Sequence, residues 1–185
     1  MNELVVLGLG SNRSLSIEKK SVGSESDFGA TLDSVQILKN AVMELKKIFE
    51  PNSVKFSSVY KSQAMYFENQ QDFYNMVFSG LYSGSAQDLL KSVNEIEAKY
   101  GRNRENEFRN GPRTLDIDIE LFGNQVINQS NLEIPHKKMK ERQFVLLPLL
   151  EIFPQLAEPI SGEFFCDIAK NLPDQNVRFF CSLSD

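Results

Sequence analysis

The chain of 185 residues has room for one domain, and its hydrophobic and charged fractions of 41% and 24% are ordinary for a globular protein. Its net charge is −5, yet residues 99–113 hold five basic against two acidic side chains, and residues 136–142 hold four against one. The rest of the chain therefore sums to −11, which excludes a general nucleic-acid binder and suits a local site for a small polyanion.

The longest apolar run, Phe144–Leu150, contains Pro148 and falls well short of the ~20 residues that a membrane span needs. The N-terminus begins Met1-Asn-Glu-Leu and has no basic region, so we expect no signal peptide. Cys166 and Cys181 have neither the spacing of a disulfide framework nor that of a metal site. We expect two reduced thiols in a cytoplasmic protein.

Hydrophobic periodicity predicts a single domain over residues 1–185 with alternating strands and helices. The predicted strands are 4–9, 54–60, 74–82 and 115–121, with a short returning strand at 125–128; the predicted helices are 32–49, 85–100, 138–151 and 164–171. Residues 13–30, 61–72 and 102–113 predict loops, the first of them long and flexible. The order β-α-β-β-α-β is that of a ferredoxin-like α+β fold. We expect an antiparallel sheet with the two long helices on one face, extra C-terminal helices, and the other face free for loops and a ligand.

Carboxylates alternate along the predicted strand 115–121. The strand period places Leu115, Ile117, Ile119 and Leu121 toward the core and places Asp116, Asp118 and Glu120 on the opposite face. Such a row is either the solvated side of a strand or a site where a divalent cation relieves the repulsion between the acids. Since Mg²⁺ takes carboxylate and phosphate oxygens together, a metal at Asp116 and Asp118 is the functional hypothesis.

Arginines lie close to these acids in the sequence. Arg113 stands three residues before Asp116 in a Gly-Pro-Arg-Thr turn, and Arg102 and Arg104 lie on the loop 102–113. A guanidinium fork matches phosphate oxygens, so the combination is typical of a phosphoryl-transfer site, although each arginine alone would be taken for a surface charge. His136, the only histidine, opens the second basic segment and is either incidental or a phosphate contact.

The segment Gly8-Leu-Gly-Ser-Asn12 follows the first predicted strand. Arg13 stands where a dinucleotide fingerprint has its third glycine, and no Gly-Lys-Ser/Thr follows as in a P-loop. The segment therefore predicts a tight turn with close backbone packing.

Six motifs occur in the order of a known family: Gly10-Ser-Asn12, Asp72-Phe-Tyr-Asn75, Gly101-Arg-Asn-Arg104, Gly111-Pro-Arg-Thr-Leu-Asp-Ile-Asp-Ile119, Leu121-Phe-Gly-Asn124 and Ile134-Pro-His136. From about residue 4 to about residue 170 the sequence resembles the 6-hydroxymethyl-7,8-dihydropterin pyrophosphokinases of folate biosynthesis. The motif at residues 111–119 is highly specific to that family. The resemblance implies a ferredoxin-like fold and transfer of the β,γ-diphosphate of ATP to the pterin hydroxymethyl oxygen, with release of AMP.

The resemblance also implies roles by position. Arg102, Arg113, Asp116 and Asp118 would be catalytic, with two Mg²⁺ ions bridging the two aspartates to ATP. Nucleotide contacts would come from Glu97, Arg104, Ile119, His136 and Arg142. The pterin pocket would comprise Ser62, Gln63, Met65, Phe73, Asn75 and Phe144.

The pocket residues suit a flat heteroaromatic ligand. Such a ligand needs stacking faces and an in-plane hydrogen-bonding group, which Phe73, Phe144 and Asn75 can supply. Core packing is the alternative for the two phenylalanines. The expected partners are ATP and the pterin alone, with no nucleic acid and no membrane, in a cytoplasmic monomer.

The chain departs from the family at three places. Where members have Arg-Trp before Gly-Pro-Arg-Thr, this chain has Arg109-Asn110, and it contains no tryptophan. Phe108, on a loop one residue longer, is a candidate substitute for that ring. The usual Thr-Pro pair is Ser62-Gln63, and residues 13–30 are an insertion relative to most members.

Two other functions stay open at this level. Nucleotidyltransferases also combine a Gly-Ser turn with a D-x-D pair, but in one short unit, whereas Ser11 and Asp116 lie about a hundred residues apart. A ferredoxin-like ligand-sensing module without catalysis has no need of D-x-D beside arginines.

Overall fold

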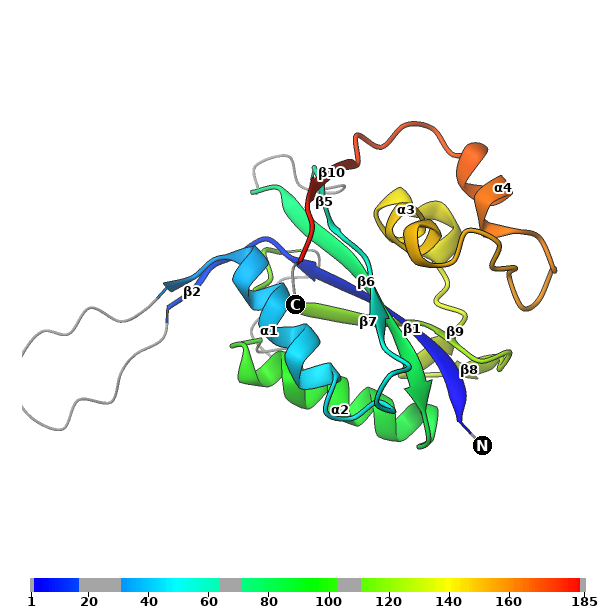
Figure 1. Cartoon of the computed structure of the whole chain (residues 1–185), viewed down its shortest axis with the longest axis horizontal. Helices are drawn as coiled ribbons and strands as arrows, with labels where there is room; N and C mark the ends of the chain where they lie inside the picture. The colour runs from blue at the N-terminus through cyan, green and yellow to red at the C-terminus, as the bar shows by residue number, and fades with distance from the viewer. Residues whose placement is uncertain (1, 17–30, 64–70, 103–110, 184–185) are drawn as a thin grey trace, which may run out of the picture.

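The computed structural model describes residues 2–16, 31–63, 71–102 and 111–183 (Figure 1). Its strands are β1 (Glu3–Ser11), β2 (Leu15–Ser16), β3 (Thr31–Leu32), β4 (Lys55–Phe56), β5 (Val59–Ser62), β6 (Phe73–Tyr82), β7 (Asp116–Phe122), β8 (Ile127–Gln129), β9 (Leu132–Ile134) and β10 (Arg178–Cys181). Its helices are α1 (Ser34–Leu45), α2 (Ala86–Lys99), a 3-10 turn (Met139–Glu141), α3 (Gln143–Ile152) and α4 (Phe165–Lys170). No helix in these ranges is long and apolar enough to cross a membrane.

The main sheet has the strand order β10-β5-β6-β1-β7, and β4 also pairs with β6. Every pairing in it is antiparallel, as the sequence predicts. Strand β1 lies between β6 and β7 and pairs with β6 from Glu3 to Ser11. The predicted returning strand 125–128 lies instead at 127–129 and pairs with β9 in a separate hairpin.

Helices cover both faces of this sheet (Figure 1). α1 and α2 pack on one face, where Leu7, Leu38 and Leu89 belong to the larger core. α3 and α4 lie over part of the other face and pack against Val6 and Val77. The expectation that this second face stays free for loops and a ligand is therefore wrong in part. The apolar side chains of α3 are buried against part of that face.

A register shift in β7 changes the predicted alternation of side chains. Val6 of β1 pairs with Leu121, but the next residue, Leu7, pairs with Ile119, so Glu120 is an extra residue on β7. Such a bulge turns the following side chain to the other face. Leu121 consequently packs with the α3 core, not with Ile119 on the α1 and α2 side as predicted.

Several predicted boundaries move. Helix α1 begins after its N-cap Asp33, whose side chain accepts from the N–H of Gln36, and is shorter than the predicted 32–49. The predicted strand 54–60 is divided into β4 and β5, and β5 continues to Ser62. The predicted loop 13–30 lies mostly outside the described residues, apart from the strand β2 at its start.

Candidate active site

Two glycines of β1 form the floor of the site. Gly10 pairs with Asp116 of β7 on one side and with Asn75 of β6 on the other, and Gly8 pairs with Asp118. A Cβ atom at Gly10 would lie 3.3 Å from Asn75 Oδ1, and one at Gly8 would lie 3.0 Å from Glu120 Oε1. The predicted tight turn is therefore wrong: both glycines lie within β1 and keep its surface open between the acids and the asparagine.

One cleft lies over this floor. Nine of the residues that the resemblance implied line it: Ser62, Gln63, Phe73, Asn75, Arg113, Asp116, Asp118, Arg142 and Phe144. It is also lined by Gly8, Leu9, Gly10, Met76, Gly111, Glu120 and Val145, which the sequence analysis did not assign to a site. The available signal for an open strand face was the pair of glycines two positions apart, Gly8 and Gly10, near the end of β1.

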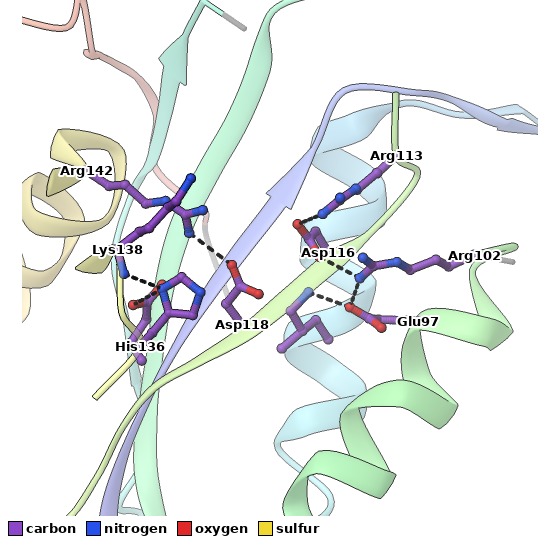
Figure 2. Close-up of polar contacts among 10 residues, drawn as sticks. Glu97, Arg102, Arg113, Asp116, Asp118, His136, Lys138 and Arg142 are labelled. Atoms are coloured by element: carbon purple, nitrogen blue, oxygen red, sulfur yellow. Dashed lines mark hydrogen bonds and ion pairs between the residues drawn. The ribbon is translucent and has the colours of Figure 1, made fainter. Parts of the chain in front are cut away.

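Arg102 and Arg113 converge on Asp116 (Figure 2). Arg102 also donates to Oε1 of Glu97, which accepts the Ile117 N–H at 2.8 Å. The Glu97 side chain is only 1% exposed, so it holds Arg102 against β7 from behind. Burial alone would raise the pKa of Asp116, but the two guanidinium groups outweigh it and lower that pKa, so this carboxylate is charged.

Asp118 has a different environment. It accepts from Nη1 of Arg142 at 3.2 Å. Burial and the nearby charge of Asp116 raise the pKa of Asp118 to about 6, against the opposing effect of Arg142. Burial and the neighbouring acid therefore disfavour the charged form of Asp118 more than one arginine favours it, and a bound cation would stabilise that charged form.

The two aspartates fit a metal that arrives with a nucleotide. Within the described ranges, no cluster of three or more His, Cys, Asp or Glu side chains could hold a metal ion by itself. Mg²⁺, however, usually takes one or two protein carboxylates and completes its shell with phosphate oxygens and water. Asp116 and Asp118 provide that number of ligands.

Asn12 holds the backbone of Arg113 in place. Its N–H donates to the Arg113 carbonyl at 3.0 Å, and its Oδ1 accepts the Arg113 N–H at 2.7 Å. Its Nδ2 donates to the carbonyl of Gln71, just before β6, at 3.3 Å. This buried side chain thus joins the ends of the two segments on either side of the cleft, a role that the sequence did not reveal.

The predicted pterin residues lie together at one end of the cleft. Asn75 is buried and donates from Nδ2 to Ser62 Oγ at 3.0 Å. Phe73 pairs with Ser62 across β5 and β6, and the Phe144 ring lies under the Arg142 guanidinium at 5.4 Å. Both phenylalanines are half-buried and line the cleft, and Phe144 also packs against the core beneath α3.

His136 lies on the Asp118 side of the site (Figure 2). Its Nδ1 accepts the Lys138 N–H at 3.3 Å and lies 3.7 Å from Oε2 of Glu120. Burial, with help from the charges of Arg142 and Lys137, lowers the pKa of His136 to about 4. The imidazole is therefore neutral near pH 7.

Three of the predicted site residues cannot be assigned to the cleft by their side chains. Met65 and Arg104 lie outside the described residues, as does the candidate lid residue Phe108. Ile119 is 4% exposed and packs in the core beneath α1 and α2. Only its main chain could meet a nucleotide.

Two acids on one strand, arginines converging on them and an aromatic cleft alongside define an enzyme of the phosphoryl-transfer class. The profile of the family described as 7,8-dihydro-6-hydroxymethylpterin-pyrophosphokinase (HPPK) matches residues 6–154. The chain belongs to this family.

Curated relatives agree with this sequence over most of its own length. The 2-amino-4-hydroxy-6-hydroxymethyldihydropteridine pyrophosphokinase of Aquifex aeolicus is 34% identical over 97% of this chain and 96% of its own. The protein of the same name from Haemophilus influenzae is 34% identical over 81% of this chain and 92% of its own. The folic acid synthesis protein fol1 of Pneumocystis carinii is 33% identical over 96% of this chain, which spans only 21% of that protein.

Solved structures agree on the fold. A chain of Plasmodium falciparum HPPK-DHPS, crystallised with pterin and p-hydroxybenzoate, matches with a TM-score of 0.63 at 14% identity. The match covers 92% of this chain and 43% of that chain. At this identity the match supports the architecture alone.

Proposed function

We propose that this chain transfers the β,γ-diphosphate of ATP to the hydroxymethyl oxygen of 6-hydroxymethyl-7,8-dihydropterin, giving the pterin diphosphate and AMP in folate biosynthesis. The observation that carries the proposal is the placement of Asp116 and Asp118 beneath Arg102, Arg113 and Arg142, beside the cleft that holds Asn75. Family membership and the names of the relatives support the same reaction.

On the nucleotide side, the arginines now bound to the aspartates would turn to the phosphates of ATP. The Asn12 side chain accepts the main-chain N–H of Arg113 and so holds the turn that carries it. A fixed position suits a group that binds ATP before reaction. Arg102 follows α2 and is held by Glu97, so it can contribute where charge develops on the transferred group. His136 and Arg142 would contact ATP from the other side, with Arg104 and the main chain of Ile119 as further contacts.

Two Mg²⁺ ions are proposed to lie between Asp116, Asp118 and the triphosphate. When bound, Mg²⁺ neutralises phosphate charge and makes the β-phosphorus more open to attack. The two carboxylates supply the protein ligands, and the raised pKa of Asp118 is consistent with a site that needs a cation.

On the pterin side, Asn75 would read the polar edge of the ring, and Phe73 and Phe144 would stack on its faces. Ser62 fixes the Asn75 amide through its hydroxyl group. Gln63 and Met65 would complete the pocket. The proton of the hydroxymethyl group would pass to solvent or to a phosphate oxygen.

The proposal includes the finer organisation of the chain. Strands β1, β5, β6 and β7 with helices α1 and α2 would form the ferredoxin-like unit, in the sheet order β5-β6-β1-β7. Residues 1–185 would act as one monomeric domain in the cytoplasm, with residues 102–113 as the catalytic loop.

The test is product analysis with purified protein. Incubation with ATP, Mg²⁺ and the hydroxymethyl pterin is expected to release AMP in an amount equal to the pterin diphosphate formed, and omission of the pterin or chelation of Mg²⁺ is expected to stop it. Release of pyrophosphate would instead indicate nucleotidyl transfer, and pterin binding without either product would indicate a ligand sensor.

A further inference from the structure

The side-chain amide of Gln175 binds the main chain on both sides of Arg142. Its Oε1 accepts the N–H of Gln143 at 2.9 Å, and its Nε2 donates to the carbonyl of Glu141 at 2.7 Å. The N–H of Gln175 donates in turn to Oε1 of Gln143 at 3.0 Å. A residue distant in the sequence thus holds the two peptide groups that flank the Arg142 Cα atom, although no residue of its segment has been assigned to the site.

The start of α3 needs such a contact. Arg142 is the N-cap of this helix, and within the described ranges its side chain makes no cap hydrogen bond. The first N–H groups of a helix have no acceptor inside the helix, so an acceptor must come from elsewhere. Gln175 supplies it to Gln143, in place of the serine, threonine or aspartate that often stands at the N-cap. The Arg142 side chain is therefore left for the site.

Arg142 extends from this main chain into the cleft. Its backbone is extended, with φ −116° and ψ 103°, between the 3-10 turn and α3. Its Nη1 donates to Asp118 at 3.2 Å, and its guanidinium lies 5.4 Å from the centre of the Phe144 ring. Because the charged group stands at the end of a long side chain, a small rotation of the two flanking peptide groups would displace it from Asp118.

The segment that carries Gln175 has its own anchors. Asp174 accepts the Asn176 N–H at 2.8 Å and the Nη2 of Arg178 at 2.7 Å, which closes a turn around Gln175. Asn176 has a φ of 56°, in the left-handed region that asparagine tolerates. The chain then enters β10, which pairs with β5 from Arg178 to Cys181 and lies at the edge of the sheet (Figure 1). The amide therefore reaches α3 from a fixed base.

We infer that Gln175 is a positioning residue that fixes the main chain of Arg142, so that the guanidinium is held in place for the nucleotide phosphates. The inference rests on the proposed ATP contact of Arg142. A side chain that is ordered before the ligand arrives loses less conformational entropy on binding, which strengthens binding without a new contact. Phe144 has a second support, since it packs against the core beneath α3, so the effect of Gln175 falls mainly on the nucleotide.

The test measures nucleotide binding separately from turnover. The probe is α,β-methylene-ATP with Mg²⁺, which cannot be cleaved at the bond that releases AMP, titrated by calorimetry into the parent and Gln175→Met. Methionine keeps the length of the side chain and removes both amide contacts. The Kd of the analogue is expected to rise about threefold to tenfold, and the Kd of the hydroxymethyl pterin is expected to stay within about twofold of the parent.

Ser85→Ala is the matched control for stability. The Ser85 hydroxyl accepts the Asp88 N–H at the start of α2, so its loss also leaves the first turn of a helix without an external acceptor. The two variants are expected to show similar falls in thermal midpoint, whereas only Gln175→Met is expected to bind the analogue more weakly. An equal loss of analogue binding in Ser85→Ala would overturn the inference. Gln175→Ala is measured in the same way if the methionine variant does not fold.

A double-mutant cycle with Arg142→Ala tests whether Gln175 acts through this arginine. Once Arg142 is an alanine, Gln175→Met is expected to weaken analogue binding no further. Parental binding by Gln175→Met, an equal rise in pterin Kd or additive losses in the double variant would each overturn the inference. Normal binding by Arg142→Ala alone would overturn it together with the proposed ATP contact, whereas AMP release by the parent would still establish the reaction.

Discussion

Asp116 and Asp118 stand two residues apart on β7 but have unequal partners. Asp116 accepts from two guanidinium groups, and their charge keeps its pKa low despite burial. Asp118 has one arginine, and burial together with the charge of Asp116 raises its pKa to about 6. The two acids are therefore not equivalent: Asp116 is part of the arginine network, and Asp118 is the one whose charge is least compensated.

Replacement of Asp118 by Asn is expected to lower kcat for AMP release at least about a hundredfold, because it removes one of two carboxylates proposed for Mg²⁺. Folding is expected to change little, since the variant keeps the shape of the side chain. Asp116→Asn is expected to lose stability as well, because Arg102 is 8% exposed and would face a neutral amide. Two measurements check this: AMP release at varied Mg²⁺ and urea unfolding, with Glu95→Gln, at an exposed position of α2, as the control. Near-parental kcat in Asp118→Asn at saturating Mg²⁺ would contradict the assignment.

Asn12 offers a test of how Arg113 is held. Asn12→Asp keeps an oxygen that can accept the Arg113 N–H but loses the donor to Gln71, and Asn12→Ala loses both contacts. We expect kcat/KM to be about tenfold lower in Asn12→Ala than in Asn12→Asp. The alanine variant also loses the hydrogen bond that holds the Arg113 main chain, and Arg113 is then placed less accurately in the site. Steady-state kinetics with both substrates checks the order of the two variants. Equal losses would show that the contact with Gln71 is the one that matters.

The pKa of His136, the only histidine of the chain, depends on its burial and on nearby charges. Burial and the charges of Arg142 and Lys137 lower the pKa of His136 from 6.5 to about 4, so an NMR titration of its ring protons is expected to show a midpoint near 4. Between these values the unfolded chain binds a proton that the folded chain does not, so this group makes stability fall as pH drops from about 6.5 to about 4. His136→Gln is expected to remove that part of the pH dependence. A midpoint near 6.5 would show a solvated ring.

At the scale of elements, α2 and β7 together assemble the charged half of the site. Helix α2 ends at Lys99, so that Glu97 reaches the Ile117 N–H of β7 and Arg102 reaches Asp116. Ser85 is the N-cap of this helix: its hydroxyl accepts the Asp88 N–H, while the Asp88 carboxylate accepts the Ser85 N–H. The start of α2 thus stabilises the helix, and its end places Glu97 and Arg102 in the site.

Ser85→Ala is expected to lower the free energy of unfolding by about 1 kcal/mol, because the alanine cannot accept the N–H at the start of α2. Threonine keeps the hydroxyl, and Ser85→Thr is expected to stay within about 0.5 kcal/mol of the parent. Urea unfolding measures both variants. The rate of AMP release is expected to be unchanged, since the cap lies at the other end of the helix from Glu97. An unchanged urea midpoint in Ser85→Ala would show that the cap contributes nothing.

At the scale of the whole molecule, the sheet has a core on each face, and the core beneath α3 borders the cleft through Phe144 and Val145. Leu38 of α1 is fully buried in the core beneath α1 and α2. Leu146 of α3 is fully buried in the opposite core, two residues after Phe144. The pocket is therefore formed where α3 meets the sheet, and the packing of α3 determines where the Phe144 ring lies.

Leu38→Ala and Leu146→Ala are each expected to lower the free energy of unfolding by about 2–5 kcal/mol through the cavity that they leave. Their effects on the pocket are expected to differ. Leu146→Ala loosens the first turns of α3 and is expected to raise the pterin Kd severalfold, whereas Leu38→Ala, measured where it is folded, is expected to keep it. Urea unfolding and pterin titration at low temperature compare the pair. Equal changes in pterin Kd would show that the position of α3 does not control the pocket.

Local patterns in the sequence were sufficient to predict the strands that form β1, β6 and β7, the two long helices α1 and α2, and the acids and arginines around Asp116. These features depend on residues that are near one another along the chain. The open face of β1 at Gly8 and Gly10, the contacts of Asn12 and the cover of the second face by α3 depended on tertiary structure, because each comes from pairing between distant segments.

Glu120 shows the difference most clearly. Its sequence position makes it the third acid on the face of Asp116 and Asp118, and the strand period alone suggests a solvated side chain. The bulge in β7 and the missing side chain at Gly8 instead bury it beside His136. A bulge is fixed by the register between two strands, which no local pattern specifies, so burial at this position was decided only when β1 and β7 came together.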